Sequence, residues 1–365
     1  MEKVLGLADI RIDGDRPWDI QVHNASFYRR VLGNPVLALG ESYMDGWWDA
    51  AELDEFFHKL LRSDVRQMVQ RDWRLSLDLL VQRFVNRQTR SGALRATARH
   101  YDRGNDLFKA MLDRRMVYSC AYWKNATTLD EAQEAKLDLV CRKMYLQPGM
   151  RVLDIGCGWG SLCRYAAERH GVTVAGINTS KEQTELGRSM CAGLPVEIDV
   201  RDYRDVEGTY DRIVSLGMFE HVGPKNYRTY MEVVHRHLKD DGLFLLHSLG
   251  GNKKVKVHDV WAEKYIFPRW SGTPIIEQIG KAAEPYFKLE DWHSIGAYYS
   301  PTLMAWFQNF HAHWPELEPR YGAPFYKMWK YFLLCGAGAF RARDSDVWQI
   351  VFSKGGVPGG YISLR

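Results

Sequence analysis

The sequence has few of the features that mark small secreted, membrane-spanning or nucleic-acid-binding proteins. Its 365 residues include six cysteines, with no CxxC pair and no regular spacing, which argues against a disulfide framework. The longest uncharged stretch, 292–315, is interrupted by proline, glutamine, asparagine and histidine, so no membrane-spanning segment is predicted. The formal net charge is only +4, and no global positive field indicates a nucleic-acid partner.

Signals for export and for metal binding are also missing. Residues 1–18 carry acids early and have neither a continuous apolar segment nor a small-residue cleavage site, so we expect a cytoplasmic protein. Histidines alternate at 235 and 237 and again at 311 and 313, but no acid or cysteine stands at ligand spacing from them. We therefore predict no metal site.

Aromatic residues, in contrast, are abundant: the chain has 13 Trp, 19 Tyr and 15 Phe. This content fits either an aromatic core or a site that holds a large apolar ligand. The composition is otherwise that of a globular protein, with 46% hydrophobic and 26% charged residues, and the length allows one large or two ordinary domains.

The first part of the chain, residues 1–82, is expected to form a small N-terminal α+β domain. Residues 18–24 alternate like a strand, and 54–73 have a helical stripe of apolar residues. Between them, the glycines and paired tryptophans of 35–50 predict a packed turn.

Two basic segments stand out from the nearly balanced charge. Residues 83–103, the predicted linker, carry six arginines against one acid, and Lys253, Lys254 and Lys256 follow a predicted strand. Such spacing is common on a solvated helix face, and it also suits contact with anionic phosphate at a membrane.

In the third segment, residues 104–365, helical and strand patterns alternate. Helical segments separate short apolar runs that are bounded by turn residues, and two further strands follow near the end. This order predicts an α/β fold with a doubly wound sheet, whose ligands bind at the carboxyl ends of the strands. The predicted strands are 151–156, 172–177, 195–200, 210–216, 242–248, 287–295 and 346–354.

The first of these strands closes into a glycine-rich turn that leads into a helix. The turn contains Asp154, Gly156, Gly158 and Gly160, and residues without side chains let a ligand approach the backbone. The spacing is GxGxG and not GxGxxG, which favours a methyltransferase over a dinucleotide enzyme. VLDIGCGWG (152–160) also resembles the first motif of class I methyltransferases.

The tips of the next two strands supply further cofactor candidates. The second strand ends without the acid that many nucleoside sites place on the ribose, and Asn178, Thr179 and Gln183 are expected to supply hydrogen bonds instead. After the third strand, Asp202 and Tyr203 are expected to hold an adenine by accepting from its amino group and by stacking.

Seven ordered motifs resemble the family of bacterial cyclopropane fatty acid synthases, to which mycolic acid cyclopropane synthases are related. The resemblance extends into the N-terminal part through LGESYMDGWWD (39–49) and so covers nearly the whole chain. The motifs are HYDRGNDLF (100–108), YSCAYW (118–123), VLDIGCGWG (152–160), GMFEHVGPKNY (217–227), EKYIFP (263–268), TLMAWF (302–307) and GAFRARD (338–344).

The resemblance implies a class I methyltransferase fold, with a Rossmann-like seven-stranded mixed sheet over 104–365. It implies methylene transfer from S-adenosylmethionine to the cis double bond of an unsaturated acyl chain in a membrane phospholipid. The methyl group is transferred first, a carbocation forms, and a bound bicarbonate removes a proton to close the ring. Tyr118 and Ser119 join the cofactor residues, and the positions that match the bicarbonate site are Cys120, Glu220, His247, Leu249 and Tyr299.

The roles implied for these five positions differ. Cys120 and Leu249 contribute backbone groups, so the thiol of Cys120 is not expected to act as a nucleophile. Glu220 orients the bicarbonate and His247 hydrogen-bonds it, whereas His221 is expected to be structural. Counting back from Thr302 selects Tyr299 over its neighbour Tyr298.

The physical demands of the reaction agree with the composition. An isolated alkene is a weak nucleophile, so the methyl group must be held in line while water is excluded, and aromatic faces stabilise a cation without attacking it. We expect peripheral association with the anionic inner face of the membrane, where the N-terminal domain of residues 1–82 has an auxiliary, lipid-presenting role. The family likeness suggests a homodimer. The alternative within enzymes is an S-adenosylmethionine-dependent lipid C-methyltransferase that leaves a methyl or methylene branch. A non-catalytic lipid-binding protein is the alternative outside them.

Overall fold

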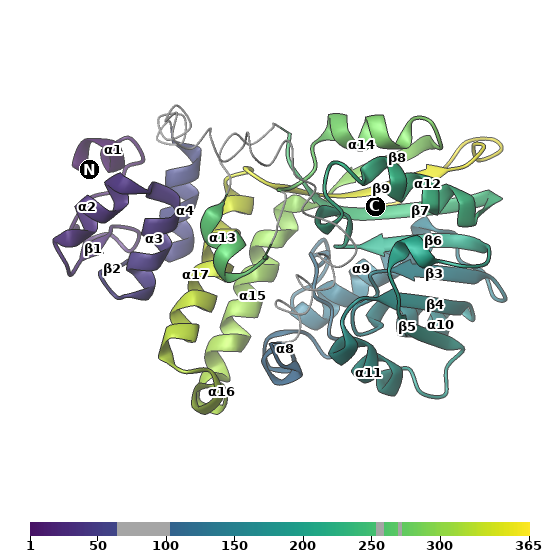
Figure 1. Ribbon diagram of the computed structural model, residues 1–365, viewed down its shortest axis with the longest axis horizontal. Helices are drawn as coiled ribbons and strands as arrows, with labels where there is room; N and C mark the ends of the chain where they lie inside the picture. The colour runs from purple at the N-terminus through teal and green to yellow at the C-terminus, as the bar shows by residue number, and fades with distance from the viewer. Residues whose placement is uncertain (64–102, 253–258, 269–271) are drawn as a thin grey trace. The chain divides into compact units, whose positions relative to one another are not determined.

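The computed structural model describes residues 1–63, 103–252, 259–268 and 272–365 (Figure 1). Most of the predicted linker, up to residue 102, and the three lysines at 253, 254 and 256 lie outside these ranges. Packing divides the described residues into two compact units. The helical unit contains 1–63, 259–268 and 299–345, and the sheet unit contains 103–252, 272–298 and 346–365. The domain boundaries near residues 82 and 103 stay predictions.

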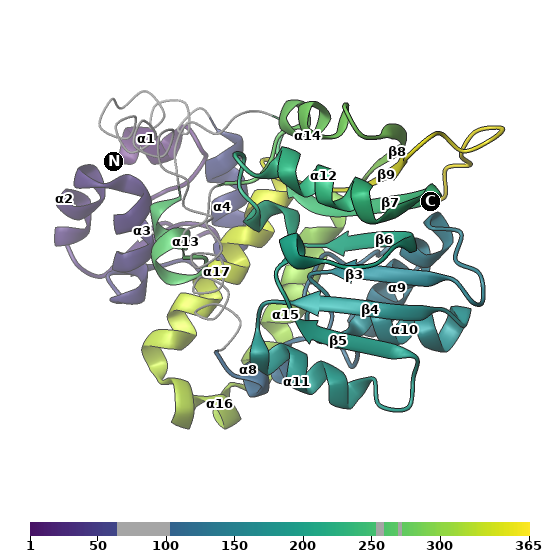
Figure 2. The same cartoon turned by 45° about the vertical axis from the view of Figure 1, so that its right-hand side comes forward.

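The sheet unit is built on one seven-stranded sheet in the order β5-β4-β3-β6-β7-β9-β8. The first five of these strands are parallel, and β9 runs antiparallel to both of its neighbours. Figure 2 shows β5, β4, β3 and β6 side by side in this order. The mixed α/β sheet confirms the predicted fold class. The strands are β3 (Arg151–Ile155), β4 (Thr173–Asn178), β5 (Val196–Val200), β6 (Tyr210–Leu216), β7 (Leu238–Gly250), β8 (Lys288–Ser294) and β9 (Asp346–Ser353).

Helices of the sheet unit begin where local sequence signals place them. Thr128 accepts a hydrogen bond from the backbone of Glu131, whose side chain bonds back to the cap, and this capping box starts α9. The helix ends before Pro148 and Gly149. The helices are α8 (Asn105–Met111), α9 (Leu129–Lys143), α10 (Ser161–His170), α11 (Lys181–Met190), α12 (Tyr227–His237) and α14 (Ile276–Ala283), with the short 3₁₀ turns η1 (Tyr203–Asp205), η2 (Phe219–His221) and η3 (Gly296–Tyr298).

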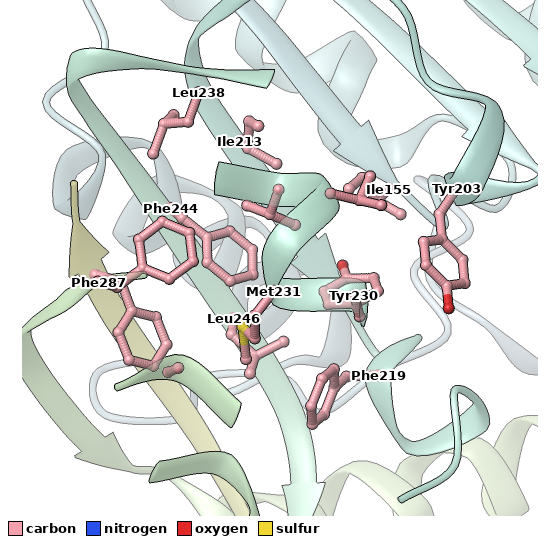
Figure 3. Packing of buried hydrophobic residues seen from close by; sticks show 14 of the residues in the cluster. Ile155, Tyr203, Ile213, Phe219, Tyr230, Met231, Leu238, Phe244, Leu246 and Phe287 are labelled. Atoms are coloured by element: carbon pink, nitrogen blue, oxygen red, sulfur yellow. The ribbon is translucent and has the colours of Figure 1, made fainter. Parts of the chain in front are cut away.

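Two hydrophobic cores cover the two faces of the sheet. Leu153 and Ile155 of β3 face the core formed with α12 and α14, where the rings of Phe244 and Phe287 lie 5.9 Å apart (Figure 3). Val152 faces the other core, formed with α9 and α10. Because alternate residues of a strand point to opposite faces, Asp154 is directed into the second core together with Val152.

The helical unit gathers segments that are far apart in the sequence. In it, α17 packs against both α4 and α15, and α3 contacts α2, α13 and α17. A Cβ atom at Gly338 of α17 would lie 2.5 Å from the backbone oxygen of Asp54, so glycine permits the close approach of α17 to α4. The elements are α1 (Glu2–Gly6), β1 (Gln21–Val22), α2 (Ser26–Gly33), α3 (Pro35–Met44), β2 (Trp48–Asp49), α4 (Leu53–Arg62), α13 (Val260–Tyr265), α15 (Tyr299–Ala312), α16 (Trp314–Tyr321) and α17 (Ala323–Arg341).

The interpretation of residues 35–50 as a packed turn was wrong for most of the segment. Asn34 caps α3 by accepting from the backbone of Leu37, and Pro35 occupies the first helical turn, where its missing N–H costs nothing. Gly40 lies inside this helix, where a Cβ atom would meet the Trp261 ring at 2.4 Å, so it serves a close contact and not a turn.

Within the described ranges, no helix has the length and apolar character needed to cross a membrane.

Candidate active site

A pocket lies in the sheet unit at the carboxyl ends of β3, β4 and β6. Segment 116–119, the glycine loop after β3 and the residues that follow β4, β5 and β6 form its walls. Ten of the eleven predicted cofactor residues line it, namely Tyr118, Ser119, Asp154, Gly156, Gly158, Asn178, Thr179, Gln183, Asp202 and Tyr203. Gly160 caps α10 just behind the loop. The residues predicted at the ends of three different strands therefore lie together, as expected where parallel strands end at one edge of a sheet.

The glycine loop owes its shape to backbone conformations that only glycine adopts readily. Gly156 and Gly158 have φ angles of +85° and +57°. A Cβ atom at Gly156 would lie 2.7 Å from the Cβ atom of Met218, whereas one at Gly158 would meet no atom within 4 Å. Gly156 is thus required by packing, and Gly158 leaves open space on the pocket side.

Asn178 ties the glycine loop to the end of β4. Its Nδ2 donates to the backbone oxygen of Gly158 at 3.2 Å and to Oε1 of Gln183 at 2.8 Å. Its Oδ1 accepts from the backbone of Thr179 at 2.8 Å. The amide at this strand tip holds the loop in place, which an acid could not do through donated hydrogen bonds.

Asp154 is the most perturbed group of the glycine loop. Burial raises its pKa to about 7, and a hydrogen bond from the Cys163 thiol to Oδ2, at 3.4 Å, opposes the shift. Its other oxygen, Oδ1, is buried and has no hydrogen-bond partner among the described residues. An unsatisfied buried carboxylate oxygen in a pocket wall is costly unless a ligand donates to it.

The wall after β5 differs from the prediction in one respect. The Asp202 carboxylate pairs with Arg204, whose Nη1 lies 3.0 Å from Oδ2, and the Arg204 guanidinium lies 4.5 Å from the centre of the Tyr203 ring. Arg201 and Arg204 also line the pocket, and sequence patterns offered no reason to single them out. Asp202 and Tyr203 are thus held by an arginine that itself borders the site.

Two further pocket residues were not predicted to have a site role. Lys136 of α9 lines the pocket and is fully buried, although a lysine in an amphipathic helix is usually solvated. His221 also lines the pocket, and burial lowers its pKa to about 4, which leaves the imidazole neutral near pH 7. The motif around Glu220 was the signal that could have identified His221.

Glu220 and Leu249, two of the predicted catalytic residues, meet between η2 and the end of β7. The Ser248 hydroxyl donates to Oε2 of Glu220 at 3.1 Å. Burial raises the pKa of Glu220 to about 7, while hydrogen bonds from Ser248 and from the backbone, including that of Leu249, oppose the shift. This carboxyl group is therefore not held in its ionised form near pH 7, so Glu220 can either accept or donate a hydrogen bond.

His247 and Cys120 are also buried in the sheet unit. Burial, with Lys136 and Lys143 nearby, lowers the pKa of His247 well below its usual value, so its ring is neutral. The backbone oxygen of His247 accepts from Gly217 at 2.8 Å and so joins β7 to the end of β6. The Cys120 thiol is directed at the backbone oxygens of Ala121 and Ile295, at 3.3 and 3.8 Å.

Tyr299, the fifth predicted position, belongs to the helical unit. It begins α15, and its ring contacts Trp306 and Phe340 at centroid distances of 5.8 and 4.6 Å. The neighbouring Tyr298 belongs to the sheet unit, where its ring lies 5.2 Å from that of Tyr122 in the YSCAYW motif. The assignment of Tyr299 stays a prediction.

Comparison with known proteins identifies relatives along almost the whole chain. The family model described as mycolic acid cyclopropane synthetase matches residues 88–350. Cyclopropane-fatty-acyl-phospholipid synthase of Escherichia coli (strain K12) is 50% identical over 353 residues, which cover 97% of this chain and 92% of that protein. A tuberculostearic acid methyltransferase of Mycobacterium tuberculosis is 32% identical over 352 residues, covering 90% of this chain and 82% of the relative. The solved structure of mycolic acid cyclopropane synthase CmaA1 complexed with SAH and CTAB matches with a TM-score of 0.68 at 31% identity, over 72% of this chain and 98% of that one.

The matched region contains the whole pocket and the surroundings of Glu220 and His247. The glycine loop and the seven ordered motifs fall within it, as do all strands of the sheet except the end of β9. From the family match and the identity along nearly its full length, the chain belongs to the mycolic acid cyclopropane synthetase family.

Proposed function

We propose that this protein transfers a methylene group from S-adenosylmethionine to the cis double bond of unsaturated acyl chains in membrane phospholipids, as a cyclopropane-fatty-acyl-phospholipid synthase. The observation that carries the proposal is the 50% identity to the Escherichia coli enzyme of that name, which extends over 97% of this chain. The pocket supports it, because the residues expected to hold the cofactor line one cavity at the strand ends.

The residues of the pocket fit S-adenosylmethionine. Gly158 offers open space beside the backbone, and the buried Oδ1 atom of Asp154 requires a donor such as an ammonium group. When bound, S-adenosylmethionine supplies an electrophilic methyl group. Asn178 and Gln183 hold the loop, and Asp202, Tyr203 and Arg204 form the wall on which a flat base would lie.

Bicarbonate is the proton acceptor that the family likeness implies, and we assign it to the surroundings of Glu220. A carboxyl group whose pKa is about 7 can be neutral and can donate a hydrogen bond to an anion, where a fully ionised one would repel it. The neutral ring of His247 adds no charge of its own. Cys120, Leu249 and Tyr299 are assigned to the same anion on the motif match.

The partners follow from the proposed substrate. The enzyme acts on an acyl chain within a bilayer, so we assign it to the inner face of the membrane, with contact to anionic headgroups. The homodimeric state is assigned on the family likeness. Vesicle flotation at low and high salt tests the electrostatic part, because contacts between exposed charges are screened by salt. Equal binding to neutral and anionic vesicles at both salt concentrations would contradict it.

The decisive experiment analyses the product. Purified protein is incubated with S-adenosylmethionine, bicarbonate and vesicles of unsaturated phospholipid, and the fatty-acid methyl esters are analysed by mass spectrometry. A gain of one CH₂ group with loss of the double bond is the expected result. Lipid binding without turnover would favour a non-catalytic protein.

A second candidate function is lipid C-methylation without ring closure. It is favoured by the 32% identity to a tuberculostearic acid methyltransferase over 90% of this chain. A methylene-branched chain in the same assay would support it, and a methyl-branched chain would form only if a hydride donor were added. A ring and a methylene branch have the same mass, so the two functions are separated by whether the product still contains a carbon–carbon double bond, which catalytic hydrogenation of the esters before analysis reveals.

A further inference from the structure

Lys136 of α9 is a buried cation that has few partners. Its side chain is fully buried, and it lines the pocket. Nζ donates one hydrogen bond, to Oγ of Ser119 at 3.0 Å, and no ion pair links it to an acid among the residues that the structure describes. An ammonium group has three hydrogens to donate, so part of its capacity is unused. A buried charge in this state is costly unless a ligand completes its contacts.

The Ser119 hydroxyl supplies a second hydrogen-bond donor beside Nζ of Lys136 in the pocket wall. An ammonium group can only donate, so the Ser119 hydroxyl is the acceptor in this bond, and its own hydrogen remains available. Gln133, one turn before Lys136 on α9, donates to the backbone oxygens of Ser119 and Val117 at 2.9 and 3.3 Å. Gln133 and Lys136 therefore both hold segment 117–119 in place at the pocket wall.

A complementary acceptor comes from β3. Oδ1 of Asp154 at the end of β3 is buried without a partner among the described residues, and Asp154 lines the same pocket. Burial lowers the pKa of Lys136 to about 8, while the charges of Asp113, Cys120 and Asp154 oppose that shift. The pocket thus presents an under-used cation and an under-used carboxylate, which together match a ligand group that carries both charges.

We propose that Lys136, with the Ser119 hydroxyl, binds the α-carboxylate of the amino-acid end of S-adenosylmethionine, while Asp154 accepts from its α-ammonium group. The inference rests on the proposed function, since it takes that cofactor as the ligand. It makes Lys136 a determinant of cofactor binding that recognises the amino acid and not the nucleoside. It also gives a reason for a lysine to be buried on α9 at this position.

Calorimetric titration with ligands that differ only at the amino-acid end tests the proposal without turnover. Lys136→Met removes the charge at similar volume, and it is expected to weaken S-adenosylhomocysteine about 10- to 100-fold. Binding of 5′-methylthioadenosine, which lacks the amino acid, should change less than about twofold. Lys143→Met is the matched control: Lys143 lies on the same helix, is fully buried and also has its pKa lowered to about 8, but it faces Asp291 and does not line the pocket. It is expected to keep wild-type affinity for both ligands.

The outcomes separate the two claims. Equal weakening of both ligands by Lys136→Met would assign the lysine a purely structural role and overturn the inference, as would unchanged affinity for S-adenosylhomocysteine. A wild-type protein that binds neither S-adenosylhomocysteine nor S-adenosylmethionine would instead overturn the proposed function. If Lys136→Met does not fold, the wild-type protein alone decides. It should bind S-adenosyl-3-thiopropylamine, which lacks only the carboxylate, about 10- to 100-fold more weakly than S-adenosylhomocysteine, and equal affinities would refute the contact.

Discussion

Alanine substitution at two glycines of the same loop should separate cofactor binding from folding. Gly158 has φ +57°, and a Cβ atom there would meet nothing within 4 Å, so Gly158→Ala costs only the left-handed conformation, about 1–2 kcal/mol. Gly156 has φ +85°, and its Cβ would lie 2.7 Å from that of Met218. Overpacking adds about 1–3 kcal/mol there, so Gly156→Ala should cost about 2–5 kcal/mol.

Gly158→Ala, the variant that costs less stability, should have the larger effect on ligand binding. The new methyl group at Gly158 enters the open side of the loop, where a nucleoside would approach, so we expect affinity for S-adenosylhomocysteine to fall about 100-fold. Ligand at 100 times the wild-type Kd stabilises the wild-type protein by about 2.7 kcal/mol, but would then stabilise Gly158→Ala by only about 0.4 kcal/mol.

Thermal unfolding with and without S-adenosylhomocysteine measures both effects. At about 2–4 °C per kcal/mol, wild-type protein should gain about 5–10 °C from the ligand, and Gly158→Ala about 1 °C. The ligand-free Tm of Gly156→Ala should be lower than that of Gly158→Ala. If Gly158→Ala keeps the full ligand-induced shift, the ligand does not approach the open side of the loop.

Three further predictions concern other parts of the molecule. Glu220→Gln should lower product formation far more than affinity for S-adenosylhomocysteine, and equal losses would reassign Glu220 to the cofactor site. Arg365→Ala should lower the free energy of unfolding by about 1–3 kcal/mol, because it removes hydrogen bonds of 2.6 and 2.7 Å to the buried Asp291. These bonds lower the pKa of Asp291, so the loss of stability should be present at neutral pH and shrink in acid, which thermal unfolding across pH measures. Gly338→Ala should destabilise the protein by about 1–3 kcal/mol, because its Cβ would clash with the backbone of Asp54 in α4. Gly336→Ala on the same helix should be neutral or stabilising, because its Cβ would meet only the flexible end of Leu303, at 3.1 Å. Similar Tm values for the two variants would contradict this packing argument.

Much of the sheet unit could be predicted because its information is local. Apolar runs such as 210–216 become buried strands, and a glycine turn after β3 requires backbone conformations that the sequence itself reveals. Residues at strand tips converge because parallel strands end at one edge, which is why eight of the ten predicted cofactor residues in the pocket meet there; Tyr118 and Ser119 come instead from the segment before α9. The helix at 35–44 was missed because Gly40 suggested a turn, although its absent side chain serves a contact with Trp261.

The sequence by itself determined the fold class, the glycine loop and the family, because these depend on local periodicity, backbone preference and ordered motifs. Only the tertiary structure decided which polar groups meet. Lys136 is buried because segment 117–119 crosses α9, and no pattern within the helix distinguishes it from a solvated lysine. The same holds for residues 299–345, which join the N-terminal helices in one unit through the contact of α17 with α4, since packing between segments hundreds of residues apart leaves no local trace in the chain.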